Sequence, residues 1–339
     1  MIVTEKICQL SHKGVDVQLN LPINHLLENS QNILIAGAGG GFDVFCGLPI
    51  YFTLRDMGKN VHLANYSFSP VEIVSHYSEV EVLRDGLLAG AKAGVPYDFN
   101  HGYFPEGYLS RWFKETYEED ITIWMFAKVG PSLLMELYQQ LVDHLQIDTL
   151  ILVDGGVDSL MIGDEAGAGT LLEDTISLAA TFDLDIPTKI LACIGFGSEL
   201  EVSHHNALAN MAALIVEDAF YGSCALTRKM PVYEQYEAAC RYVWEQPSHY
   251  KSQINMRIVS ATLGAFGNYH LYHDYLPLEV YVSPLMSLYW FFDAEAVARR
   301  SLLRKAIEGT ASIQEAHAQT IKLRAMLMSK ARHNKPLPY

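Results

Sequence analysis

One stretch of the chain decides its fold: Ile33-Leu34-Ile35-Ala36-Gly37-Ala38-Gly39-Gly40-Gly41-Phe42-Asp43. Its apolar start is too short for a helix and too apolar for a loop, so it predicts a buried parallel strand. The glycines that follow allow a tight turn and a close approach of the backbone to a ligand. A helix is predicted next, from Phe42 to Met57, and its free amide groups favour a bound anion.

Further apolar runs extend this pattern along the chain. Strands are predicted at residues 61–66, 121–126, 149–153, 189–194 and 278–282. Helices are predicted at residues 131–144, 170–182 and 207–220, after Pro231, and from Pro284 to about Arg332, and a capping box over 170–173 marks the start of the second. The alternation predicts an α/β, Rossmann-like fold, with a mostly parallel sheet, helices on both faces and a C-terminal helical extension.

The chain is long enough for one large domain with a substantial core. It has 339 residues, half of them hydrophobic. We expect a Rossmann-like domain over residues 1–283, with an excursion at about 68–118 that covers the site, and a helical region over 284–339 packed on it. The methionine and aromatic residues of 284–292 indicate core or a subunit interface, and a homo-oligomer is expected.

Composition excludes several classes of partner. Acidic residues outnumber basic ones by 39 to 24, and a net charge of −15 disfavours nucleic acid and anionic membrane surfaces. Five scattered cysteines without a CxxC pair indicate a reducing compartment. The N-terminus has no secretion signal, and no apolar run approaches the roughly 18 residues of a membrane span. A cytoplasmic location is therefore expected.

The first glycine loop is predicted to cradle a phosphorylated ligand through backbone amides, and tight packing of strand on helix is the alternative. The residues concerned are Gly37, Gly39, Gly40 and Gly41. The register departs from GxGxxG, and the strand at 61–66 ends without the acid that dinucleotide enzymes use, which disfavours NAD. No GxxxxGK[ST] occurs, which disfavours a Walker-type NTPase. Asp43 either complements the helix dipole or meets a ligand hydroxyl or metal.

Three predicted strands end in glycine, at Gly37, Gly155 and Gly195. In parallel α/β sheets, ligands bind beyond the carboxyl ends of the strands, near the point where the strand order reverses. These three loops are therefore the predicted site, provided that the strand order brings them together.

The second loop reads Asp154-Gly155-Gly156-Val157-Asp158-Ser159 and continues to Gly163-Asp164-Glu165. Crowded carboxylates repel one another unless a cation balances them. Oxygen ligands of this kind suit Mg²⁺ or Mn²⁺. The predicted metal ligands are Asp154, Asp158, Asp164 and Glu165, and the predicted ligand-binding residues are Gly155, Gly156 and Ser159. A solvated acidic loop is the alternative.

The third loop, Gly195-Phe196-Gly197-Ser198-Glu199, precedes two adjacent histidines. Gly195 and Gly197 are predicted to contact the ligand. His204 or His205 is predicted to act with Asp158 in catalysis, as general acid, base or ligand. A structural or solvent-facing histidine is the alternative.

Two resemblances add to these predictions. Residues 154–159 resemble the SGGxDS phosphate loop of the ATP pyrophosphatase family, which would imply adenylation, although Asp154 stands where that family has serine. The Gly-Ala-Gly-Gly-Gly-Phe-Asp and Asp-Gly-Gly-Val-Asp-Ser-Leu-Met loops, with Ser283-Pro-Leu-Met-Ser-Leu-Tyr-Trp-Phe-Phe-Asp, resemble a prokaryotic family known as domain of unknown function 1152. That resemblance spans most of residues 30–310 and implies no activity.

Three functions remain open from the sequence. The first is a Mg²⁺- or Mn²⁺-dependent enzyme that acts on a nucleotide, such as ATP, or another phosphorylated small molecule. The second is an ATP-pyrophosphatase-like adenylating enzyme. The third is a non-catalytic nucleotide or metabolite sensor, which would not need the carboxylates.

Overall fold

The computed structural model describes residues 17–94, 97–165, 171–246, 251–271 and 280–327. Its centre is a nine-stranded mixed sheet in the order β3-β4-β5-β2-β1-β6-β7-β9-β8. The strands are β1 (Asn32–Gly37), β2 (Asn60–Tyr66), β3 (Val80–Arg84), β4 (Leu88–Ala91), β5 (Ile123–Phe126), β6 (Thr149–Asp154), β7 (Thr188–Ile194), β8 (Phe220–Ala225) and β9 (Leu288–Asp293).

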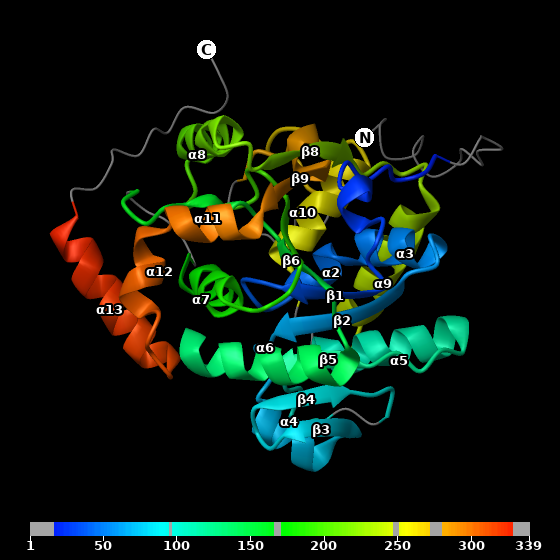
Figure 1. The fold of residues 1–339 in the computed structure, drawn as a ribbon. Coiled ribbons are helices and arrows are strands. Elements are labelled where there is room, and N and C mark those ends of the chain that lie inside the picture. The colour runs from blue at the N-terminus through cyan, green and yellow to red at the C-terminus, as the bar shows by residue number, and fades with distance from the viewer. Residues whose placement is uncertain (1–16, 95–96, 166–170, 247–250, 272–279, 328–339) are drawn as a thin grey trace.

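Helices cover both faces of the sheet. The α-helices are α2 (Asp43–Cys46), α3 (Leu48–Asp56), α4 (Val71–Tyr77), α5 (Pro105–Tyr117), α6 (Pro131–Leu145), α7 (Leu171–Phe182), α8 (His204–Val216), α9 (Pro231–Trp244), α10 (Gln253–Thr262), α11 (Ala294–Arg300), α12 (Leu302–Ile307) and α13 (Ile313–Met326). Short 3-10 turns are η1 (Asn24–Leu27), η2 (Asp158–Leu160) and η4 (Pro284–Ser287). Figure 1 shows α6, α7, α11, α12 and α13 on one side of the sheet and α2, α3, α9 and α10 on the other.

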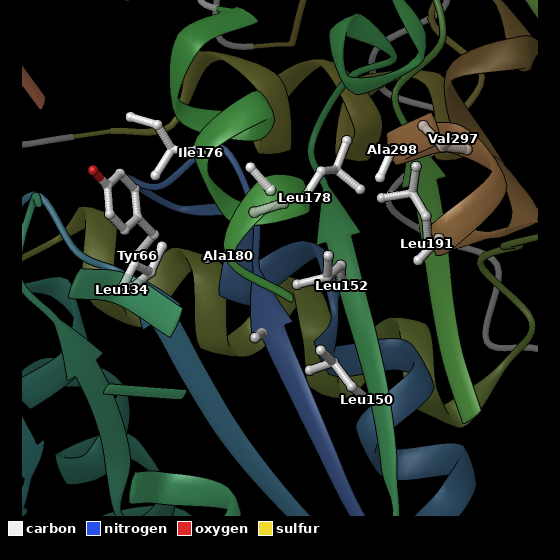
Figure 2. Packing of buried hydrophobic residues seen from close by; sticks show 14 of the residues in the cluster. Tyr66, Leu134, Leu150, Leu152, Ile176, Leu178, Ala180, Leu191, Val297 and Ala298 are labelled. Carbon is white, nitrogen blue, oxygen red and sulfur yellow. The ribbon is translucent and has the colours of Figure 1, made fainter. Parts of the chain in front are cut away.

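Two hydrophobic cores, one on each face, follow from the alternation of side chains along the buried strands. Leu34, Leu150 and Leu152 belong to the core shared with α6, α7 and α11. Figure 2 shows the packing of Leu150 and Leu152 in this core. Ile35 and Ile151 point to the other core, under α2, α3, α9 and α10. Strands buried on both faces are continuous apolar runs, which is why the sequence identified them.

The parallel part of the sheet is its middle. β1 pairs in parallel with β2 and β6, β2 with β5, and β6 with β7. The register aligns Gly37 with Asn65 on one side and with Val153 on the other, so the carboxyl ends of β2, β1 and β6 meet at one edge. This edge carries the candidate site.

The prediction of a mostly parallel sheet is wrong for its two borders. β3, β4, β9 and β8 pair antiparallel with their neighbours, so the sheet is mixed. None of these four strands was predicted. β3 and β4 lie in the 68–118 excursion, β8 contains Gly222 in an otherwise short, half-buried run, and β9 lies in the predicted helical region. The Rossmann-like assignment stays a prediction.

The helical prediction from Pro284 onward is wrong over residues 288–293, which form β9 between β7 and β8. Its run Leu288-Tyr-Trp-Phe-Phe is apolar without a break, and a buried strand and a buried helix cannot be told apart from such a run. Tyr289 and Phe291 face one core and Phe292 the other, so these residues are core. The predicted division at residue 284 and the homo-oligomer stay predictions.

Other predicted boundaries change in detail. The helix predicted over 42–57 is two helices, α2 and α3, that meet at Gly47 with Pro49 in the first turn of the second. A Cβ at Gly47 would lie 2.6 Å from Ile35 Cγ2, so the close packing of α2 on β1 needs glycine here. The strand predicted at 278–282 and the capping box at Thr170 fall partly outside the described residues, and Val282 forms an isolated bridge with Gly267. Among the described residues, no helix combines the length and apolarity needed to cross a bilayer.

Candidate metal centre

A cavity of about 500 Å³ lies beyond the carboxyl ends of β1 and β6. The first and second glycine loops, the end of the third loop with the residues after it, and the start of α10 line it. Its acidic lining residues are Asp43, Asp154, Asp158, Asp174, Glu199 and Glu201. The three loops that follow β1, β6 and β7 therefore each bring at least one carboxylate to this edge of the sheet.

Three aspartates form the centre of this acidic wall. Asp154 ends β6, Asp158 begins η2 and Asp174 lies in the first turn of α7. One carboxylate oxygen from each lies within 4.8 Å of those of the other two, a spacing that can hold a metal ion. Each residue is only 2% exposed. We call these residues the aspartate triad.

Asp174 was not predicted from the sequence. Its Oδ1 atom is buried and, within the described structure, has no hydrogen-bond partner. Burial raises the pKa of Asp174 well above its usual value, and the charges of Asp158 and Asp154 raise it further. The signal in the sequence was an acid inside the apolar run of a predicted buried helix, Leu171-Leu-Glu-Asp-Thr-Ile-Ser-Leu.

Asp154 accepts hydrogen bonds from Ser159, a residue that the sequence assigned to ligand binding. The Ser159 hydroxyl donates to Asp154 Oδ2, and the Ser159 amide donates to the same oxygen at 3.2 Å. Burial, followed by the charge of Asp158, nevertheless raises the pKa of Asp154 to about 8. Ser159 thus orients a triad carboxylate in this structure, and its contact with a ligand stays a prediction.

Asp43 connects the first loop to the second. Its Oδ2 accepts from the Gly39 amide at 2.7 Å, and the Gly155 amide also donates to its carboxylate. Burial, Asp154 and Asp158, in that order, raise the pKa of Asp43 well above its usual value. Asp43 therefore lies at the cavity as part of the same repelling group of carboxylates.

Glu199, the second residue missed as a site candidate, comes from the third loop. Its Oε2 accepts from the Val157 amide at 2.8 Å, and its carboxyl group is hydrogen-bonded to that of Asp158. Burial and the neighbouring Asp158 raise the pKa of Glu199 well above its usual value. Carboxyl groups that raise one another's pKa in this way form a site that a cation would stabilise.

The glycines of the loops make room for these carboxylates. A Cβ at Gly39 would lie 2.6 Å from Asp174 Oδ2, one at Gly155 2.7 Å from Asp43 Oδ1, and one at Gly156 2.4 Å from Glu199 Oε2. The sequence predicted close approach of a ligand phosphate at these positions. In the structure, the protein's own carboxylates make that approach.

The remaining predicted glycines are placed around this centre. Gly37 lies against Asn65, while Gly40 and Gly41 take positive φ values of 93° and 60° beside Phe68. Gly40 lines the cavity, and Gly195 and Gly197 turn the third loop just outside its lining. Their contacts with a ligand stay predictions.

Asp164 and Glu165 do not join the aspartate triad or the cavity lining. Glu165 is buried and accepts from the Ile162 amide at 3.0 Å, the Gly163 amide at 2.8 Å and Asn210 Nδ2 at 2.9 Å. Two of these donors belong to its own loop and the third to α8, so Glu165 is satisfied outside the cavity lining. Their predicted role as metal ligands has no support from this placement.

The two histidines also lie outside the cavity lining. His204 begins α8 and packs on Phe196 with ring centroids 5.1 Å apart, and burial lowers its pKa. His205 is exposed. Ser203 caps the helix by accepting from the Asn206 amide. The predicted acid–base role of His204 or His205 therefore has no support from their position.

A second buried acid lies at the same edge of the sheet. Glu106, on α5, is fully buried and accepts from Asn65 Nδ2 at 2.8 Å, Ser67 Oγ at 2.6 Å and Ser69 Oγ at 2.6 Å. Asn65 also donates to the Gly41 carbonyl at 2.8 Å, which ties this group to the first glycine loop. We call it the Glu106 network. Glu106 does not line the cavity, and its carboxylate is satisfied by these protein donors.

The fold and the site together define an α/β protein with a buried acidic centre at the carboxyl edge of a mixed sheet. The chain belongs to the family described as "Protein of unknown function (DUF1152)", whose match covers residues 115–328. No curated protein and no solved structure matches the chain. Nothing found supports the resemblance to the ATP pyrophosphatase loop. In the structure, the Val157 amide of that loop donates to Glu199, and the Ser159 hydroxyl and amide donate to Asp154. These donors are therefore bonded to carboxylates of the protein.

Proposed function

We propose that the protein is a metal-dependent enzyme, of hydrolase or transferase class, that acts on a nucleotide or another phosphorylated small molecule. The observation that carries the proposal is the aspartate triad, buried and lining a cavity of ligand size. The triad presents carboxylate oxygens only, which suits Mg²⁺ or Mn²⁺ better than softer metals. Such an ion, when bound, would supply Lewis-acid stabilisation of charge on a phosphoryl group.

The strand order supports a ligand at this place. The five parallel strands lie across the sheet in the order β5-β2-β1-β6-β7. If they are numbered 1 to 5 as they occur in the chain, this order is 3-2-1-4-5. This is the order of a Rossmann-like sheet, which we propose for the core. The order reverses between β1 and β6, where ligands of such sheets bind, and the cavity lies at that junction.

The negative charge of the cavity favours binding of a metal ion ahead of a phosphate. The acidic lining of the cavity would repel a phosphate that arrived alone. A divalent cation at the aspartate triad reverses that repulsion and attracts the phosphate to the same place. A phosphorylated ligand is therefore expected to bind only together with the metal.

Mn²⁺ binding tests the centre directly. Wild type, D158N, D174N and the exposed control D85N would be titrated with Mn²⁺ by calorimetry, with free Mn²⁺ followed by electron paramagnetic resonance. We expect wild type and D85N to bind, and D158N and D174N to lose binding while keeping the native circular dichroism spectrum. Mn²⁺ binding that survives in both triad variants would refute the centre.

Turnover separates the enzyme from a sensor. The Mn²⁺- or Mg²⁺-loaded protein would be incubated with a panel of nucleotides and sugar phosphates, and the products followed by ³¹P NMR. Release or transfer of phosphate that D174N lacks would support the enzyme. A ligand that binds with metal and is recovered unaltered after long incubation would support the sensor instead. The buried carboxylates favour the enzyme, because a sensor would not need them.

A further inference from the structure

One buried cation faces the acidic cavity. Arg257 lies on α10, is 3% exposed and is the basic residue among the described residues that line the cavity. An arginine in a pocket with six acidic lining residues would be expected to form an ion pair with one of them. Within the described chain, however, Arg257 forms no ion pair within 4.0 Å, and Glu201 and Glu199 act on its guanidinium group without contacting it.

The hydrogen bonds of Arg257 leave one edge of its guanidinium group underused. Nη1 donates to the Ser198 carbonyl at 2.5 Å, and Nη2 donates to Gln253 Oε1 at 3.3 Å. Nε is buried and has no partner among the described residues. Nε and Nη2 form the edge that binds two oxygens of a phosphate or carboxylate side by side. A buried guanidinium with an unpaired Nε and no direct ion pair is costly, so this edge favours a bound anion.

The start of α10 reinforces the positive side of the cavity. Ser252, Gln253 and Ile254 line it, at the N-terminal end of a ten-residue helix. The amide groups and dipole of a helix N-terminus favour an anion. Arg257 and the start of α10 thus bring positive groups to a cavity that six acidic residues also line, with Glu199 and Glu201 on the side of Arg257.

We propose that Arg257 binds the phosphate group of the substrate, between the guanidinium edge and a metal ion on the aspartate triad. This inference rests on the proposed function, and it makes the substrate a small phosphorylated molecule whose phosphate binds in the cavity that Arg257 and the triad both line. Arg257 is then a substrate-binding residue, and metal binding does not depend on it. The Ser198 carbonyl and Gln253 hold the side chain in place.

Inorganic phosphate is the probe that tests Arg257. Its affinity for the Mn²⁺-loaded protein would be measured by calorimetry for wild type, R257M and R257K, with R304M as a matched control. Arg304 is also buried, at 7% exposure, but its guanidinium lies over the Phe182 ring at 4.1 Å, away from the cavity. We expect R257M to weaken phosphate binding about tenfold or more, R257K to retain part of it, and R304M to bind as wild type does.

Each outcome separates this inference from the proposed function. If R257M and R257K still bind Mn²⁺, they are folded at the site, and a loss of phosphate binding in R257M supports the inference. Phosphate affinity unchanged in R257M would overturn it and leave the metal centre standing. Malonate binding to Mn²⁺-loaded wild type more tightly than phosphate, and lost in R257M, would overturn the phosphate assignment in favour of a carboxylate substrate. Failure of wild type to bind Mn²⁺ would overturn the metal centre itself.

Discussion

Two buried acidic groups lie at the same edge of the sheet and have opposite surroundings. Glu106 accepts three side-chain hydrogen bonds, from Asn65, Ser67 and Ser69. The aspartate triad instead has carboxylates next to carboxylates, with Asp174 Oδ1 unpaired among the described residues. Burial of an acid therefore does not by itself indicate a ligand site. The number of donors around it distinguishes a structural acid from one that requires a cation.

The largest expected difference comes from the same chemical change made in both groups. E106Q replaces an acceptor by an amide and disrupts the Glu106 network, so we expect a loss of about 3 kcal/mol in the free energy of unfolding. D174N replaces a carboxyl group whose ionisation its buried, acidic surroundings oppose by a neutral amide, so the metal-free variant should be as stable as wild type or more stable. Urea denaturation of the metal-free proteins measures both. An equal loss in the two variants would contradict the comparison.

Saturating Mn²⁺ should then bring the free energies of unfolding of the two variants close together. At one hundred times its dissociation constant, Mn²⁺ should stabilise wild type by about 2.7 kcal/mol. E106Q should gain the same amount, because its centre is intact, whereas D174N should gain nothing. Thermal unfolding with and without Mn²⁺ measures the gain, and Ca²⁺ serves as a test of size selectivity. A gain in D174N equal to that of wild type would place the ion elsewhere.

The pH dependence of the metal-free protein should report the triad. Folded Asp154, with its pKa raised to about 8, keeps a proton that the unfolded chain releases above about pH 4. The unfolded state therefore binds fewer protons between these values, and stability falls as pH rises. Asp154 alone should lower the free energy of unfolding by about 2 kcal/mol from pH 6 to pH 8.

Saturating Mn²⁺ should remove most of this fall, because the metal binds the ionised carboxylates. D154N should show a flatter profile than wild type without metal, and E106Q should keep the wild-type slope. Chemical denaturation at pH 6, 7 and 8 measures all three proteins. A metal-free wild type that becomes more stable toward pH 8 would contradict the assignment.

The smallest effect is expected from the residue that orients Asp154. S159A removes the hydroxyl that donates to Asp154 Oδ2 and keeps the hydrogen bond from the backbone amide of residue 159. The ionised form of Asp154 is then less favoured, so Mn²⁺ binding should weaken by about 1 kcal/mol. S203A, which removes the cap of α8 outside the cavity, is the control and should leave Mn²⁺ affinity unchanged. Equal Mn²⁺ affinity in S159A and wild type would show that Ser159 has no part in the centre.

Much of the parallel core could be predicted, because buried strands are short apolar runs. The runs at Ile33, Leu150 and Ile190 each proved to be strands, and the glycines and acids after the first two mark the carboxyl edge of the sheet. β9 could not be predicted in the same way, since it lies among helices and its unbroken apolar run has no period. Two acids of the site could not be predicted either. Asp174 comes from a helix and Glu199 from the third loop, and nothing local in the sequence shows that they meet Asp154 and Asp158.

The sequence by itself determined the α/β class, the acidic second loop with Asp154 and Asp158, and the glycines that turn each loop at a strand end. These are local properties, set by hydrophobic runs and by residue types at particular positions. Only the tertiary structure decided which carboxylates meet. The parallel order places β1 beside β6, α7 brings Asp174 to them, and α10 brings Arg257 across the cavity, while Glu165 lies outside the cavity lining. Contacts between residues far apart in the chain depend on strand order and helix packing, and no local pattern encodes them.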